Sequence, residues 1–276
     1  MASDTEIAKL LAHIAACHTA VLPGIRLPLY AGERHFGYLT LADAARLAAV
    51  ASGTVVTDER VEMPAALLPQ LNELAVAMGI PTRAEDFDVR EHAEGPSLGV
   101  LDRGALPSFG VIGVGVHLNG LVRRADGLHL WVAKRAADKK LDPGKLDHLV
   151  AGGVPAGFSP FEALLKEAEE EAGLPEAMTA QARQVAVFKY NMERPEGLRR
   201  DVLYAYDIEL PEYFIPHPMD GEVESFALWP LAQVAEVLAT SEEFKFNVNL
   251  VLIDLLLREG FYTGTQAATL RAALNG

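Results

Sequence analysis

The sequence predicts an α+β protein in which a small α+β domain over residues 1–108 precedes a larger domain over residues 109–276. Helical patterns alternate with turns in the first part, strand-like patterns begin near Phe109, and a polar helix interrupts the later strands. Strands with helices before and after them are typical of an α/β/α sandwich around a mixed sheet. Half of the 276 residues are hydrophobic, which is enough for a substantial core.

The first part contains three helical patterns separated by turns that contain Pro or Gly. The first pattern follows Ser3 and Asp4, either of which suits a helix N-cap, and it lacks the basic start of a signal peptide. The histidines scattered here have no metal-ligand spacing, so we expect them at the surface or satisfied in the core. We expect helices at 4–20, 41–51 and 64–79, and extended segments at 34–39 and 54–57.

The second part begins with two strands that a turn at Asp126-Gly127 joins into a hairpin. A helix follows at 159–172, with Ser159 as its N-cap, Pro160 at its first position and Gly173 at its end. The remaining pattern predicts strands at 184–190, 202–210 and 223–229, a loop that holds Arg194, Arg199 and Arg200, and helices at 231–240 and 247–259.

Three acidic residues of the helix at 159–172 are the main functional signal. Glu167, Glu170 and Glu171 lie three and four residues apart, so they share one face. Three neighbouring carboxylates repel one another unless a cation binds, and oxygen ligands favour Mg²⁺, with Mn²⁺ as the alternative ion. A solvated acidic face is the other interpretation. Apolar residues recur on a different face of the helix, at Phe161, Leu165, Ala168 and Ala172.

The register of these glutamates resembles the Nudix box, a glycine, five residues, a glutamate, seven residues and then R-E-U-x-E-E-x-G-U, with U a bulky aliphatic residue. Here Gly152 begins the pattern and residues 166–174, KEAEEEAGL, end it at the matching distance. Phe158 replaces the first glutamate and Lys166 replaces the arginine. Further segments resemble the branch related to the Nudix portion of fungal thiamine pyrophosphokinase fusions, which has an extra N-terminal domain: residues 117–120, 146–153, 220–226 and 244–260.

The resemblance implies a Nudix sandwich that hydrolyses a diphosphate linked to another group. It implies that Glu167, Glu170 and Glu171 bind the metal, that Glu167 and Glu170 act in catalysis, and that Gly152 and Gly153 let the backbone approach the site. The branch suggests thiamine diphosphate or its oxidised analogues as the substrate, cleaved to a monophosphate. An ADP-ribose or dinucleotide pyrophosphatase is one alternative, and a diphosphate-sensing module without catalysis is the other.

Other polar residues are candidates for the same site. Glu222 and Glu224 lie where some Nudix enzymes place a further metal ligand or the general base. Arg135 suits a phosphate clamp because a guanidinium binds two oxygens at once, and His117 and Asn119 share one face of the first strand. Each also has a structural explanation, as a solvated turn, an edge charge or a satisfied core group. Weaker candidates are Arg194, Arg199 and Arg200 for phosphate binding, and Tyr190, Trp131 and Trp229 for stacking.

The net charge of −14 excludes several kinds of partner. Nucleic acid and anionic membranes require basic surfaces, so we expect neither. A diphosphate substrate is also repelled unless metal ions and local arginines or lysines reverse the field at the site. Cys17 is the single cysteine and excludes an internal disulfide. We expect a cytoplasmic protein whose N-terminal domain covers the active-site mouth, shapes substrate choice or forms a homodimer contact.

Overall fold

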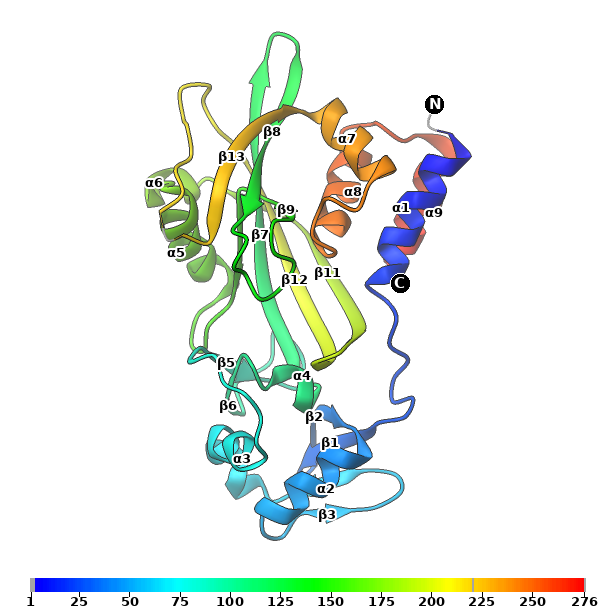
Figure 1. Ribbon diagram of the computed structural model, residues 1–276, viewed down its shortest axis with the longest axis vertical. Helices are drawn as coiled ribbons and strands as arrows, with labels where there is room; N and C mark the ends of the chain where they lie inside the picture. Colours follow the sequence, from blue (N-terminus) through cyan, green and yellow to red (C-terminus); the bar gives the residue numbers. More distant parts are fainter. Residues whose placement is uncertain (1–2, 220, 276) are drawn as a thin grey trace.

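The computed structural model describes residues 3–219 and 221–275. It is an α+β molecule in which a large lobe is built on a seven-stranded sheet and a small lobe lies at one end (Figure 1). The predicted fold class is therefore confirmed. Residue 220, which belongs to one of the segments that resemble the Nudix family, lies outside the described residues.

The small lobe is a four-stranded sheet and a two-stranded ribbon, with short helices packed against them. The sheet has the order β2-β1-β4-β3, in which β1 is antiparallel to β2 and parallel to β4. Its core includes the fully buried Leu29, Phe36 and Leu47. The elements are β1 (Leu27–Ala31), β2 (Arg34–Leu39), α2 (Leu41–Val50), β3 (Val55–Val56), β4 (Val61–Met63), the 3-10 helix η1 (Ala65–Gln70), α3 (Leu71–Ala77), the ribbon strands β5 (Asp86–Val89) and β6 (Gly99–Asp102), and α4 (Leu106–Phe109).

The large sheet is mixed, as predicted, with the order β11-β12-β7-β8-β13. β7 and β8 form the hairpin predicted at Asp126-Gly127, and β12 pairs parallel with β7 while the other neighbours are antiparallel. Two short strands extend the sheet, because β10 pairs with β7 and β9 pairs with β8. The strands are β7 (Ile112–Arg124), β8 (Gly127–Arg135), β9 (Leu146–Asp147), β10 (Val150–Gly153), β11 (Arg183–Arg194), β12 (Gly197–Glu209) and β13 (Val223–Pro230).

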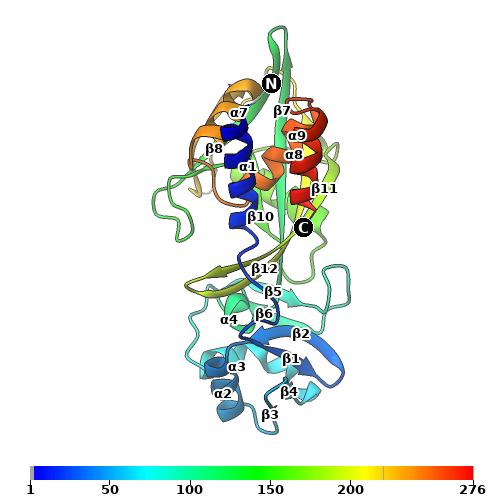
Figure 2. The same ribbon diagram turned by 90° about the vertical axis from the view of Figure 1, so that its right-hand side faces the viewer.

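Helices cover both faces of this sheet, because alternate residues of its strands are apolar on both sides. One core joins β7 and β12 to α5, and α6 packs beside α5. The other core joins β8 and β11 to four helices that lie side by side on the opposite face (Figure 2). The helices are α5 (Pro160–Ala172), α6 (Glu176–Thr179), α1 (Asp4–Ala16), α7 (Leu231–Thr240), α8 (Val248–Arg258) and α9 (Gly264–Leu274).

The first helix belongs to the core of the large lobe, although its sequence position lies within residues 1–108. Ile7, Leu10 and Ile14 of α1 are buried against the C-terminal helices α7, α8 and α9. Figure 1 shows α1 beside α9 at the far side of the molecule from the small lobe. The domain boundary between residues 108 and 109 stays a prediction. Helix α1 lies before this boundary in the sequence but packs against helices that lie after it.

Several local features differ from the sequence prediction, and strands β1, β4, β5 and β6 of the small lobe were not predicted. Arg194, Arg199 and Arg200 do not lie in a loop, because β11 and β12 continue through them and only residues 195–196 connect the strands. Alternating apolar residues such as Leu198 and Val202 explain the extension of β12. The helix α9 was not predicted either, since its alanine-rich sequence has little contrast between its faces.

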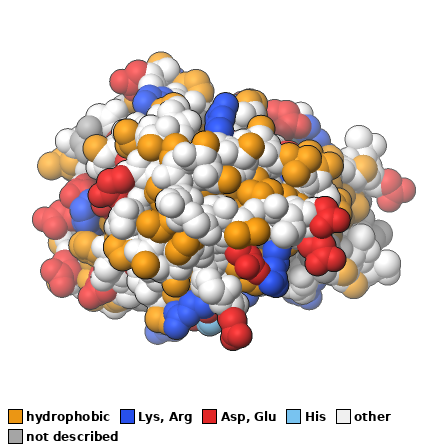
Figure 3. Space-filling view, turned by 90° about the horizontal axis from the view of Figure 1, so that it is seen from below, with side chains coloured by type: hydrophobic (Ala, Val, Ile, Leu, Met, Phe, Trp, Pro, Cys, Tyr) orange, Lys and Arg blue, Asp and Glu red, His pale blue; other side chains and the backbone are white. Residues whose placement is uncertain are grey.

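The surface agrees with the mixed composition of the chain. At the end formed by the small lobe, hydrophobic side chains are scattered among uncharged atoms, with acidic and basic groups towards the rim (Figure 3). Among the described residues, no helix is both long enough and apolar enough to cross a membrane.

Candidate active site

The helix that carries the three glutamates, α5, is fixed at both ends by local interactions. The Ser159 hydroxyl accepts from the backbone N–H of Glu162, and the Glu162 carboxylate accepts from the backbone N–H of Ser159, which forms a capping box. Pro160 occupies the first turn, and Gly173 ends the helix with φ of +61°, a conformation that favours glycine. The start and end predicted from the sequence are both present.

The three glutamates differ in exposure, which corrects the predicted helix faces. Glu170 is half exposed and Glu167 is mostly buried, whereas Glu171 is only 6% exposed. Glu171 therefore lies at the packed edge of α5, where its Oε2 accepts from the backbone N–H of Ala151 at 2.8 Å. The buried apolar residues of α5 are Ala163, Leu164, Ala168 and Ala172, while Phe161 and Leu165 are only partly buried.

Burial and nearby negative charge raise the pKa values of Glu167 and Glu171. Burial raises the pKa of Glu171 to about 8. The pKa of Glu167 is also raised, first by burial and then by the charge of Glu170. Lys166 offsets part of this charge because its Nζ contacts a carboxylate oxygen of both Glu167 and Glu170. One lysine does not balance the carboxylates of Glu167 and Glu170, and a divalent ion would supply the further positive charge.

The two adjacent glycines of β10 leave room for two different side chains. A Cβ at Gly152 would lie 2.4 Å from Oε2 of Glu167, so the side chain of Glu167 occupies the space that a larger residue would take. A Cβ at Gly153 would lie 2.4 Å from the ring of Phe87, which comes from β5 of the small lobe. The absence of a side chain at Gly152 thus leaves space for Glu167, and the absence of one at Gly153 leaves space for Phe87 of the small lobe.

An outer cavity of about 650 Å³ lies beside these glutamates. Its lining contains Glu167, Glu170 and Glu222, together with the glycines of β10. Eight lysines and arginines line it against five acidic residues, so the local charge is positive although the chain carries −14. This is the reversal of the field that a phosphorylated ligand needs. The basic residues are Arg83, Arg103, Arg135, Lys139, Lys140, Lys166, Arg199 and Lys245.

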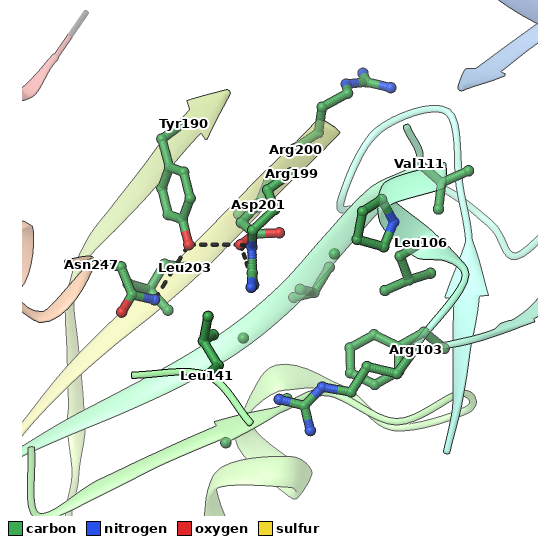
Figure 4. A pocket seen from close by; sticks show the side chains of 18 of the residues that line it. Arg103, Leu106, Val111, Leu141, Tyr190, Arg199, Arg200, Asp201, Leu203 and Asn247 are labelled. Atoms are coloured by element: carbon green, nitrogen blue, oxygen red, sulfur yellow. Dashed lines mark hydrogen bonds and ion pairs between the residues drawn. The ribbon is translucent and has the colours of Figure 1, made fainter. Parts of the chain in front are cut away.

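An inner cavity of about 110 Å³ adjoins the outer one and shares several of its walls. Tyr190 donates to Asp201 at 2.6 Å, and Arg199 binds the same carboxylate oxygen at 2.7 Å (Figure 4). The Asn247 amide donates to the Tyr190 hydroxyl, and its own oxygen is buried without a hydrogen-bond partner among the described residues. Apolar walls come from Leu106, Val111, Leu141 and Leu203. The inner cavity thus combines apolar walls with a fixed polar end.

Arg135 and His117 line the cavities, but protein groups already bind them. Arg135 donates to Asp147 at 2.8 Å and to the carbonyls of Leu141 and Asp142, so it holds the loop between β8 and β9. His117 lies 2.6 Å from His148, measured between their Nδ1 atoms.

Of the two acidic candidates after the helix, one lies at the cavity and the other does not. Glu222 lines the outer cavity and contacts Lys139. Burial raises the pKa of Glu222, but Lys139, Arg103 and Arg135 outweigh it, and the pKa lies below its ordinary value. Glu224 lies in β13 and its carboxylate binds Lys134 at 2.9 Å, outside the lining of the cavities.

The remaining candidates divide in the same way. Tyr190, Arg199 and Arg200 line the inner cavity. Asn119 does not, because it is fully buried and its amide donates to Asp207 at 2.8 Å. Arg194 pairs with Asp142 and Glu196, and both tryptophans pack elsewhere, with Trp131 in one core and Trp229 beside Phe244.

Comparison with known proteins identifies a known domain. Residues 115–249 match the NUDIX domain, a range that contains the glycines, α5 and most of the cavity lining. This part of the chain is a NUDIX domain. Nudix hydrolases are pyrophosphatases that typically use a divalent metal, and α5 is the Nudix helix of this chain.

The chain is similar to curated Nudix proteins of plants. It is 44% identical to Nudix hydrolase 20, chloroplastic, and 42% identical to Nudix hydrolase 24, chloroplastic, both of Arabidopsis thaliana. Each alignment covers 74% of this chain, and they cover 54% and 55% of the relatives. The alignment with the first spans 204 residues, more than residues 109–276 contain, so it extends into the N-terminal part. The chain spans about half the length of these relatives.

Two further proteins are similar over more limited ranges. The uncharacterized protein YJR142W of Saccharomyces cerevisiae is 34% identical over 179 residues, which are 59% of this chain and 52% of the relative. The solved structure of DR0079 from Deinococcus radiodurans covers 68% of this chain and 99% of its own length, with 20% identity and a TM-score of 0.46.

The donor set of the Nudix helix fits a hard divalent ion better than a second group of potential ligands does. Atoms of His117, Asp147 and His148 lie within 4.8 Å of one another. Asp147, however, already binds Arg135 and Lys245, whose charges hold its pKa well below the ordinary value although burial opposes this. Two fixed cations beside a fully enclosed site disfavour a third, so the glutamates are the better candidate.

Several cavity residues were missed by the sequence analysis. Arg83, Glu85, Phe87 and Arg103 come from the small lobe, where no spacing signalled a site. Lys245 lies before α8 and is buried between the two cavities. The adjacent pair Lys139-Lys140 was the available local signal for a basic site, whereas the others are brought together by tertiary contacts alone.

Proposed function

We propose that this protein hydrolyses the diphosphate bond of a small organic diphosphate with the help of Mg²⁺, releasing a monophosphate. The observation that carries the proposal is that Glu167, which lies against Gly152, and Glu170 line a cavity whose lining is basic in an acidic protein. A site with this charge arrangement accepts a metal ion and phosphate oxygens together.

Each side chain has a defined part in this proposal. Glu167, Glu170 and Glu171 hold the metal, and Gly152 leaves the space that Glu167 needs. When bound, Mg²⁺ stabilises charge on phosphoryl oxygens and lowers the pKa of a bound water. Glu222 is the preferred candidate for general base or further ligand, because it lines the outer cavity and Glu224 does not. Mn²⁺ has the same ligand preference and is the alternative ion.

The organic group of the substrate has a place in the inner cavity, which adjoins the glycines of β10. Its apolar walls and its polar end, formed by Tyr190, Asp201 and Asn247, suit a heterocycle with hydrogen-bonding groups. We propose thiamine diphosphate or its oxidised analogues as the first substrates to test. ADP-ribose and dinucleotides are the alternative class, and they differ in that a second sugar or nucleoside must occupy the outer cavity.

A second candidate function is diphosphate sensing without turnover. It is favoured by Lys166, which replaces the arginine of the Nudix box and contacts both Glu167 and Glu170. The ammonium group of Lys166 neutralises part of the carboxylate charge that a metal ion would otherwise neutralise. Sensing predicts that diphosphates bind independently of Mg²⁺ and are not cleaved.

The appearance of phosphorylated cleavage products, followed by chromatography, decides between these functions. The panel is thiamine diphosphate, oxythiamine diphosphate, ADP-ribose, NADH and nucleoside triphosphates, each with excess Mg²⁺. We expect selective cleavage that Glu170→Gln reduces by several orders of magnitude. The matched control is Glu169→Gln on the same helix, because Glu169 is exposed and lies outside the cavity lining. Equal rates for wild type and Glu170→Gln would contradict the proposed site, and binding without cleavage would favour sensing.

Location and assembly are separate proposals. A cytoplasmic location stays our expectation, whereas the two plant relatives are named chloroplastic. A homodimer also stays a prediction, to be tested by the mass of the purified protein in solution.

A further inference from the structure

The ribbon formed by β5 and β6 packs directly against the loop that leads into the Nudix helix. The backbone N–H of Ala156 donates to the carbonyl of Asp86 at 2.8 Å, and that of Gly157 donates to the Asp88 carboxylate at 3.0 Å. The ring of Phe87 fills the space next to Gly153. The small lobe is therefore attached to the same loop that positions the metal-binding glutamates.

Arg103 extends from the end of β6 into both cavities (Figure 4). Its guanidinium lies over the ring of Phe87, 5.8 Å from the ring centre, and its Nη1 donates to Glu85 at 2.8 Å. The side chain is 42% exposed. Stacking and the ion pair hold the guanidinium in place, while much of its surface still faces the cavity.

The pair of Arg103 and Glu85 lies at the Nudix site itself. Both residues line the outer cavity together with Glu167, Glu170 and Glu222. The arginine of the small lobe thus shares one cavity wall with the proposed metal ligands.

Two of the other arginines of the lining, Arg135 and Arg199, have their donors bound to protein oxygens. Arg135 donates to three of them, and Arg199 binds Asp201 through two nitrogen atoms. Among the residues that the structure describes, Arg103 has one ion pair, with a carboxylate that is itself a third exposed. Moving Arg103 from Glu85 to a ligand anion therefore breaks fewer hydrogen bonds than moving Arg135 or Arg199 from its partners.

We propose that Arg103 binds the phosphate oxygens of the substrate, so that the N-terminal lobe completes the active site of the Nudix domain. The inference rests on the proposed function, because it assigns one residue of the same site. A guanidinium binds two phosphate oxygens at once, and Arg103 lines the same cavity as Glu167 and Glu170, which would hold the metal. Of the three roles open for the N-terminal part, the structure assigns the shaping of the substrate site.

The test compares Arg103→Gln and Arg103→Lys with a matched control in the same lobe. Arg60 is the control because it also pairs with a glutamate, Glu62, and lies over an aromatic ring, that of Tyr30 at 5.5 Å. Arg60 lies outside the lining of the cavities. Thermal unfolding of every variant establishes that the fold is retained.

Two measurements are made on each full-length variant. The first is KM and kcat for the best substrate of the panel, and the second is the binding of inorganic pyrophosphate with Mg²⁺ by calorimetry. We expect Arg103→Gln to raise KM at least tenfold and to weaken pyrophosphate binding by a similar factor, since charge-assisted hydrogen bonds to phosphate are lost. Arg103→Lys should recover part of both losses, and Arg60→Gln should leave both unchanged.

The outcomes separate this inference from the proposed function. If the wild type cleaves its substrate and Arg103→Gln retains its KM and its pyrophosphate affinity, the role of Arg103 is wrong and the hydrolase proposal stands. If no substrate is cleaved but pyrophosphate binding depends on Arg103, the binding role stands and the hydrolase proposal is wrong. Equal losses in Arg103→Gln and Arg60→Gln would assign the effect to the lobe in general and overturn the inference.

Discussion

Replacing Gly152 by alanine tests how the glutamates are positioned. The added Cβ would lie 2.4 Å from Oε2 of Glu167 and 2.5 Å from its Cγ and Cδ, whereas ordinary contact begins at 3.4 Å. Gly152 is not among the residues with positive φ, so alanine suits its backbone and the protein should fold. The strain is therefore relieved by Glu167, whose carboxylate must move by roughly 1 Å.

The displacement should cost activity and not stability. A misplacement of this size at a catalytic group, or the loss of support for a metal ligand, typically lowers affinity or rate by about 10- to 100-fold. A 100-fold loss corresponds to about 2.7 kcal/mol of transition-state stabilisation. We expect Gly152→Ala to need more Mg²⁺ for half-maximal rate and to unfold within about 1 kcal/mol of the wild type.

The assay is a Mg²⁺ titration of the rate, with urea unfolding of the same samples. Gly153→Ala is the comparison, because its Cβ would meet the ring of Phe87 instead of Glu167. That variant should lose stability and raise KM while keeping the wild-type dependence on Mg²⁺. A folded Gly152→Ala protein with the wild-type rate and Mg²⁺ dependence would refute the placement of Glu167 at the metal.

The remaining predictions concern stability. Leu10→Ala should lower the free energy of unfolding by about 2–5 kcal/mol, because Leu10 is fully buried among the C-terminal helices. Urea unfolding checks this, with Ala12→Ser at an exposed position of the same helix as the control. Equal unfolding curves for the two variants would place α1 outside the core. Burial lowers the pKa of His148 from 6.5 to about 4, so between these pH values the unfolded state alone binds the proton, and stability should fall by on the order of 3 kcal/mol as pH decreases from 6.5 to 4. His148→Gln should show a shallower decrease in the same unfolding series, and an unchanged slope would contradict the assignment.

Local sequence signals were sufficient for the elements that carry the chemistry. The capping residues Ser159 and Glu162, Pro160 and Gly173 act within a few residues, so the sequence defined the Nudix helix to within one residue. The hairpin at Asp126-Gly127 and the helix at 231–240 follow from equally local patterns. The periodicity did not reveal which edge of the helix packs, because the burial of Glu171 depends on β10 and not on α5 itself.

The sequence by itself determined the NUDIX domain, the glutamate helix and the glycine that precedes it, since these depend on spacing along one stretch of chain. The tertiary structure alone decided that the second glycine faces Phe87, that Arg135 is bound to Asp147, and that α1 joins the C-terminal helices. It also brought Arg103 to the glutamates, across more than 60 residues of sequence. Contacts of this kind arise from how two lobes pack, and no local propensity or periodicity encodes them.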